Sequence, residues 1–148
     1  MRYLHRFKTF ENYDNKKVKI AEYTRNYISN LNKIELEQIK REIEKFAIKN
    51  NCSVDELSNP EFVRNLLSAN IEEGIGTWIK DNWYKLCNYI GIGGKIAGII
   101  TFVGSLALYH MNGTDTITGV KIGVAAYIIS NIVQSLKDLD VLKESKTI

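Results

Sequence analysis

Residues 90–109 of this chain read IGIGGKIAGIITFVGSLALY, and residues 117–136 read ITGVKIGVAAYIISNIVQSL. Both stretches are apolar and glycine-rich, and Lys95 and Lys121 are the only charged residues in them. Runs of this length exceed an ordinary strand, so they predict two helices joined by the polar link of residues 110–116. Such a hairpin cannot stay bare in water, and we expect lipid or other polypeptide to cover it.

A membrane is one candidate cover for the hairpin. The uncharged runs, residues 96–109 and 122–136, would span only about 21–23 Å as helices, against ~30 Å for the hydrocarbon core. Each helix becomes long enough only if Lys95 and Lys121 extend their ammonium groups outward to the headgroups. The link has no lysine or arginine, whereas both outer flanks have several. This bias predicts that both termini stay on the cytoplasmic side of the membrane.

Glycines and flanking aromatic residues define the positions expected to act in lipid. Small residues four apart let helix backbones approach closely, and the expected packing positions are Gly94, Gly98, Gly104, Gly119 and Gly123. Aromatic rings and lysines gather at the membrane interface, and the positions expected there are Trp78, Trp83, Tyr84, Lys85, Tyr89, Lys95, Tyr109 and Lys121.

Protein is the alternative cover. Asn131 and Gln134 interrupt the second stretch on a face shared with Tyr127, and such polar side chains favour burial in protein over exposure to lipid. The glycines at 91, 93 and 94 would also serve as a flexible entry to the hairpin in a soluble oligomer. Aromatic residues at helical spacing, as before this hairpin, also form protein cores. The residues alone leave both hypotheses open.

The chain before the hairpin predicts further helices. Asn32 and Glu35 form a capping box that begins a helix running to about Lys49. A second capping box begins a single turn at Ser53, and Pro60 takes the first position of the next helix, where its missing N–H costs nothing.

These patterns predict an all-α fold, an N-terminal helical bundle followed by an apolar, glycine-rich helical hairpin. Residues 15–70 would form the bundle and residues 71–90 a tryptophan-rich connecting helix. Residues 91–136 would form the hairpin and residues 137–148 a polar tail.

Residues 1–14 predict a basic, aromatic leader peptide. Tyr3, Phe7 and Phe10 recur at helical spacing between arginines and a lysine, and we expect them to dock on this domain or on a partner. The run from Met1 to Glu11 resembles the leading peptides of small head-associated proteins of tailed bacteriophages, in which a basic residue and spaced aromatics end in Phe-Glu. The resemblance covers these residues only. It implies a virion component whose leader directs it into the prohead and is removed in some phages.

Composition and motifs argue against catalysis and against several ligands. The net charge of +3 is too small for a nucleic-acid surface. The Gly91–Lys95 run is followed by Ile96, which fits neither a dinucleotide fingerprint nor a P-loop. His5 and His110 lie far apart, and Cys52 and Cys87 lack metal-ligand spacing. We expect no enzyme, cofactor, metal or small-molecule substrate, and free cysteines of a reducing compartment.

Two function hypotheses follow from the sequence. The first is a membrane-active or membrane-anchored, non-enzymatic protein, phage-encoded, that forms homo-oligomers through its glycine-rich helices as a pore or delivery component. The alternative is a soluble structural subunit of a phage particle or similar assembly, with the hairpin buried between copies. The partners would accordingly be the chain itself and either membrane lipid or neighbouring subunits, and the location a membrane or a virion.

Overall fold

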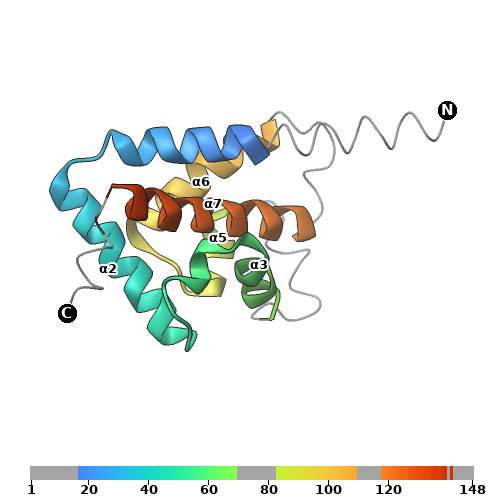
Figure 1. The fold of residues 1–148 in the computed structure, drawn as a ribbon. Coiled ribbons are helices and arrows are strands. Elements are labelled where there is room, and N and C mark those ends of the chain that lie inside the picture. Colours follow the sequence, from blue (N-terminus) through green and yellow to red (C-terminus); the bar gives the residue numbers. More distant parts are fainter. Residues whose placement is uncertain (1–16, 70–82, 110–117, 140, 142–148) are drawn as a thin grey trace.

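The computed structural model of the chain describes residues 17–69, 83–109, 118–139 and 141. All of the regular structure in these ranges is helical, which confirms the predicted all-α class. Figure 1 shows α7 crossing the middle of the molecule, with α2 near one end of it and α3 toward the other. The elements are a helix over residues 17–29, α2 (Lys33–Lys49), the 3-10 turn η1 (Glu56–Ser58), α3 (Pro60–Ala69), α5 (Trp83–Ile90), α6 (Gly94–Tyr109) and α7 (Thr118–Asp138).

The helix boundaries before residue 70 follow the capping chemistry of the sequence. The Asn32 side chain accepts from the Glu35 N–H at 2.8 Å, and the Glu35 carboxylate accepts from the Asn32 N–H at 3.2 Å. Ser53 and Glu56 make the same reciprocal pair before η1. α3 begins at Pro60. These predicted starts are confirmed, because each depends on hydrogen bonds within one turn.

The core is built around α7. This helix packs against α3, η1, α6 and α2, and most of its described side chains are buried. The side chain of Asn131 donates to the Tyr127 carbonyl oxygen at 2.8 Å, so this polar group is satisfied within the helix. At the end of the helix Lys137 pairs with Asp55 at 2.7 Å, which ties α7 to the turn before α3. The second apolar stretch is therefore covered by this chain's own helices.

One hydrophobic cluster joins the predicted bundle to the predicted hairpin. It includes Ile28, Ile43 and Leu67 from the first part of the chain and Ile100 and Ile129 from the second. Residues from the range 15–70 and residues from the range 91–136 therefore contribute to the same buried cluster. The described residues do not include the leader (1–14), most of the connecting helix (residues 70–82), the link (residues 110–117), or residues 140 and 142–148 of the tail.

The first apolar stretch is not one continuous helix. α5 ends at Ile90, three residues follow in a non-helical link, and α6 begins at Gly94. Gly91 and Gly94 both have positive φ angles, of 82° and 64°, and only glycine adopts such angles without strain. Within the described residues, none of the helices combines the length and the hydrophobicity needed to cross a membrane.

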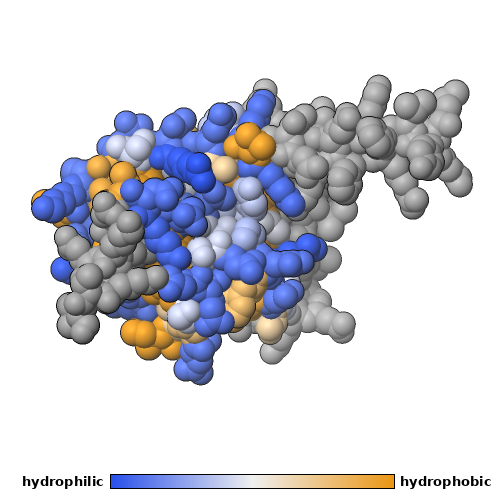
Figure 2. All heavy atoms as spheres, in the orientation of Figure 1, coloured by the Kyte–Doolittle hydropathy of each residue, from blue (hydrophilic) through white to orange (hydrophobic). Residues whose placement is uncertain are grey.

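Hydrophobic residues on the surface are dispersed. Figure 2 shows a mainly hydrophilic face with small, separate hydrophobic patches. The large exposed side chains include Ile34 and Ile48 at opposite ends of α2 and Phe102 in the middle of α6. Single exposed isoleucines are common on protein surfaces. Phe102 differs from them because its neighbours along α6, residues 98–105, are all uncharged.

Candidate functional site: the anchored helix α6 and its exposed face

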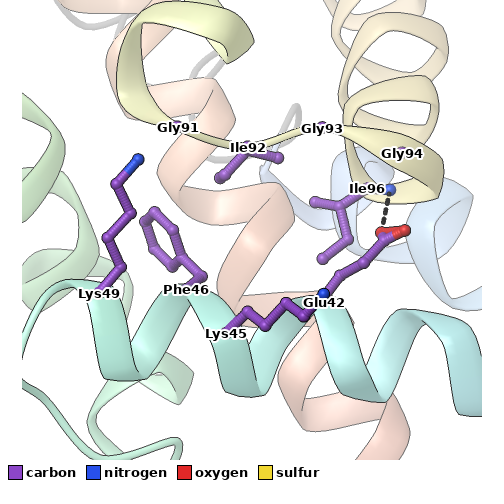
Figure 3. Close-up of a pocket in the computed structure, with 9 residues that line it drawn as sticks. All are labelled: Glu42, Lys45, Phe46, Lys49, Gly91, Ile92, Gly93, Gly94 and Ile96. Atoms are coloured by element: carbon purple, nitrogen blue, oxygen red, sulfur yellow. Dashed lines mark hydrogen bonds between the residues drawn. The ribbon is translucent and has the colours of Figure 1, made fainter.

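The N-terminus of α6 is held by a carboxylate from α2. Glu42 accepts from the Lys95 backbone N–H at 2.9 Å and from the Ile96 backbone N–H at 3.2 Å. The first N–H groups of a helix have no partner inside it and carry the positive end of the helix dipole. The Glu42 carboxylate meets both needs, so it acts as a cap supplied by a distant helix. Figure 3 shows this side chain reaching from α2 to the first turn of α6.

A second carboxylate of α2 reinforces the anchorage. The Lys95 ammonium group donates to Glu35 at 3.0 Å, with both side chains about one-third exposed. Glu35 is also the acidic member of the α2 capping box. Its hydrogen bond from the Asn32 N–H, and then the one from Lys95, hold its pKa below the usual value of 4.5. Lys95, expected at a membrane interface, thus lies in an intramolecular ion pair.

The link between α5 and α6 forms one wall of a pocket of about 310 Å³. The opposite wall is α2, from which Lys45, Phe46 and Lys49 contribute side chains (Figure 3). A side chain at Gly91 would collide with the Lys49 ammonium group. The pocket is therefore shaped by a close approach between the link and α2, and the Glu42 carboxylate lies where the pocket meets the first turn of α6.

Trp83 joins α5 to α6 and lies near α7. Its side chain is 7% exposed, and its ring lies so near Gly104 that a Cβ atom there would be 2.7 Å from the ring. The Lys121 ammonium group lies 5.7 Å from the centre of the same ring, a distance at which a cation attracts the ring's π face. Lys121 is itself only 4% exposed. These two residues, expected at a membrane interface, lie inside the protein.

The outward side of α6 carries no charged side chain between Gly98 and Ser105. We call Gly98, Thr101, Phe102 and Ser105 the α6 face; three of them are exposed, and Thr101 is half-buried. The Thr101 hydroxyl donates back to the Ala97 carbonyl oxygen at 2.8 Å. Phe102 is 54% exposed and lies against Tyr27 of the first helix, with ring centres 5.9 Å apart and planes at 50°. The face is thus an uncharged surface with one aromatic projection.

The structure distributes the remaining predicted residues among different environments. Gly98 is exposed, with nothing within 4 Å of a Cβ placed there, whereas Gly104 receives the Trp83 ring. Gly94 is the first residue of α6, Gly123 lines a second pocket near α3, and Lys85 is exposed on α5. Four other predicted positions lie in α5, α6 or α7, but their surroundings are outside the described part of the structure: Tyr84, Tyr89, Tyr109 and Gly119. Trp78 and the leader residues Tyr3, Phe7 and Phe10 lie outside the described residues.

Metal ligands and reactive thiols were also sought among the described side chains. No group of three or more histidine, cysteine, aspartate or glutamate side chains that could hold a metal ion occurs in the described part of the chain. Burial raises the pKa of the Cys87 thiol to about 12. Burial, with a smaller contribution from Glu56, also raises that of Cys52. A reactive cysteine needs the opposite shift.

Sequence reasoning missed the two glutamates that anchor α6. Glu35 was expected only as part of the capping box, and Glu42 had no expected role. The contact between Glu42 and Lys95 joins residues 53 positions apart, so no local pattern announces it. The sequence contains one indirect sign of this contact. No residue of Gly91–Gly94 has a side chain able to cap α6, so the first N–H groups of this helix need an acceptor from elsewhere.

Comparisons of this chain with models of protein families, with curated proteins and with solved structures found no match in any of the three.

Proposed function

We propose that this chain is a non-enzymatic helical subunit that associates with a second copy of itself through the α6 face. The observation that carries the proposal is the half-exposed Phe102 ring on an uncharged helix surface, beside the open position at Gly98. Covering a half-exposed aromatic ring on an uncharged helix surface removes apolar area from water, which favours a protein contact there. The proposal keeps the structural-subunit hypothesis from the sequence but moves the interface to the outside of α6.

The α6 face is complementary to itself. Gly98 and Phe102 lie one helical turn apart on the same side of α6, about 6 Å along the axis. In a dimer with a two-fold axis, residue i of one copy meets residue j of the other and the reverse contact is equivalent. An antiparallel pairing centred between these two residues would place each Phe102 ring over the partner's Gly98, where a Cβ would otherwise fill the space.

The size of the α6 face limits the affinity. Gly98 to Ser105 spans roughly 10 Å of helix, and Tyr27 widens it by one ring. Stable dimers bury about 800 Å² on each partner, which is much more than this surface offers. We therefore propose weak association of isolated copies, strengthened in an assembly where several contacts act together.

The capping of α6 also supports a role for its exposed face. A contact surface is most useful when it does not need to be ordered during binding. Glu42, Glu35 and Trp83 fix the first turn and the middle of α6 against α2 and α5. Phe102 is thereby presented by a helix whose position is set before a partner arrives.

The proposal is tested by sedimentation velocity over a wide concentration range. The wild-type chain should show a sedimentation coefficient that rises with concentration, and Phe102→Lys should abolish that rise. Gly98→Leu should do the same, because its side chain has room in the monomer but would occupy the space of the partner's ring. Ile34→Lys is the matched control, since Ile34 is 80% exposed but lies on α2, and it should associate like the wild type.

Two results would count against the proposal. A wild-type chain that stays monomeric up to millimolar concentration would remove the proposed partner. Flotation of the wild type with lipid vesicles, abolished by Phe102→Lys, would show instead that the α6 face binds a membrane surface, as the first sequence hypothesis supposed. The phage origin implied by residues 1–11 stays a prediction, which the genes neighbouring the coding sequence would test.

A further inference from the structure

We propose that the outward side of α2 docks on the surface of a membrane that contains anionic lipid. The inference goes beyond self-association and uses a different helix, so either proposal can fail without the other. It rests on the exposure of the outward residues of α2, on the sign of their charges and on their alignment along the helix.

The outward residues of α2 form one narrow stripe. Six exposed residues of this helix lie within about 100° of one another around its axis. The side of α2 that faces the core carries the buried residues Ile39, Ile43 and Phe46. We call the six outward residues the α2 stripe: Ile34, Gln38, Arg41, Lys45, Ile48 and Lys49.

Every charged residue of the α2 stripe is basic. Arg41, Lys45 and Lys49 follow one another at intervals of four residues, a spacing at which like charges destabilise a helix. None of the three takes part in an ion pair between described residues. The acidic residues of α2 are half-buried instead, and two of them, Glu35 and Glu42, bind α6. The stripe is therefore complementary to a negatively charged partner.

The α2 stripe also presents two isoleucines to the solvent. Ile34 and Ile48 are 80% and 76% exposed, more than any other large hydrophobic side chain of the described residues. Each is ordinary when taken singly, but fourteen residues are nearly four helical turns, so both lie on the same side of α2, about 21 Å apart. A helix that lies on a bilayer buries such side chains at the headgroup boundary and keeps its basic groups among the headgroups.

The order of residues along the α2 stripe favours lipid over an acidic protein. Protein interfaces have an apolar centre from which charged residues are depleted, and a polar rim. In the stripe this order is reversed, because Arg41 and Lys45 lie between the two isoleucines. A bilayer imposes no such order, since it offers negative headgroups and hydrocarbon at every point of its plane.

Flotation of the full chain with lipid vesicles tests the proposal. One set of vesicles consists of phosphatidylcholine with about one-third phosphatidylserine, and the other of phosphatidylcholine alone. The chain should float with the first set and remain unbound with the second. Raising the salt concentration from about 0.1 M to about 1 M should release it, because the screening length falls from ~10 Å to ~3 Å.

Four variants locate the binding surface. Arg41→Gln should lower the partition coefficient about fivefold, which is the contribution of one cation near an anionic bilayer. Arg64→Gln removes the same charge from an exposed position on α3 and should bind nearly as the wild type. Ile48→Ser should lower the partition coefficient about tenfold, since one isoleucine would no longer be buried. Phe102→Ser should bind as the wild type. All four side chains are exposed, so the fold should persist, as circular dichroism would check.

Four outcomes would overturn the proposal. The first is the absence of flotation with the phosphatidylserine vesicles. The second is equal binding to phosphatidylcholine alone, which would remove the role of the basic residues. The third is an equal loss in Arg41→Gln and Arg64→Gln, which would mean that net charge and not the α2 stripe decides binding. The fourth is a loss in Phe102→Ser without one in Ile48→Ser, which would place the lipid contact on the α6 face.

Discussion

The indole ring of Trp83 lies against the backbone of Gly104, at a distance that leaves no room for a side chain on α6. A Cβ placed on Gly104 would be 2.7–3.0 Å from three ring carbons, whereas a Cβ on Gly98 would meet nothing within 4 Å. Two glycines six residues apart on one helix therefore serve different purposes. Gly104 leaves room for the Trp83 ring of α5 to pack against α6, whereas Gly98 faces outward.

This difference predicts opposite effects of one substitution on stability. Gly98→Ala should raise the free energy of unfolding by up to ~1 kcal/mol, since alanine favours a helix over glycine by about that amount. Gly104→Ala should lower the free energy of unfolding by about 1–3 kcal/mol, because the bulky Trp83 ring would have to shift within a packed core. Urea denaturation of both variants measures the change in the free energy of unfolding. The same change in both variants would contradict the contacts assigned to Gly98 and Gly104.

The Glu35–Lys95 pair predicts a shift in the pKa of one carboxyl group. Lys95→Met should raise the pKa of Glu35, but the value should remain below 4.5, because the Asn32 N–H makes the larger contribution to lowering it. Carboxyl-detected NMR titration of wild type and variant measures both values. A Glu35 pKa that does not change on loss of Lys95 would show that the ion pair does not form in solution.

The two cysteines should differ in their reaction with thiol reagents. Burial raises the pKa of Cys87 to about 12, so a Cys52→Ser chain should react at pH 8 at least ~100-fold more slowly when folded than in denaturant. A Cys87→Ser chain keeps the half-buried Cys52 and should react faster than the Cys52→Ser chain. Stopped-flow absorbance with an aromatic disulfide provides the rates. Similar rates for both folded variants would place Cys87 at the surface.

Local chemistry made much of this fold predictable from the sequence. The capping boxes at Asn32 and Ser53 and the proline at position 60 fix three helix starts, because each depends on atoms within one turn. The buried face of α2 follows from the same kind of local pattern, since Ile39, Ile43 and Phe46 recur at helical spacing and are all buried.

The relation between the apolar helices and the rest of the chain was not predictable in the same way. The hydrophobicity of residues 122–136 shows that they must be buried. The sequence pattern does not distinguish burial in lipid from burial in protein. The structure supplies the cover from α3, η1 and α6. Thr24, a polar residue on the first helix, is also fully buried, and its hydroxyl is satisfied there because it donates to the Ile20 carbonyl oxygen at 2.8 Å.

The candidate site depends on contacts between residues that are far apart in the sequence, and local sequence patterns do not predict such contacts. The small residues of α6 indicated close packing, but only the structure shows which of them face Trp83 and which face outward. In the sequence, Lys95 and Lys121 have the same positions next to apolar runs as lysines that anchor a helix at a membrane interface. In the folded chain one pairs with Glu35 and the other lies over an indole ring, because residues distant in sequence provide those partners.

An isotope-filtered NOE measurement on a mixture of labelled and unlabelled chains tests the proposed contact most directly. At millimolar concentration the account predicts NOEs between the Phe102 ring of one copy and the Gly98 α-protons of another, absent from Phe102→Lys. Intermolecular NOEs confined to other surfaces, or none between copies at that concentration, would contradict it.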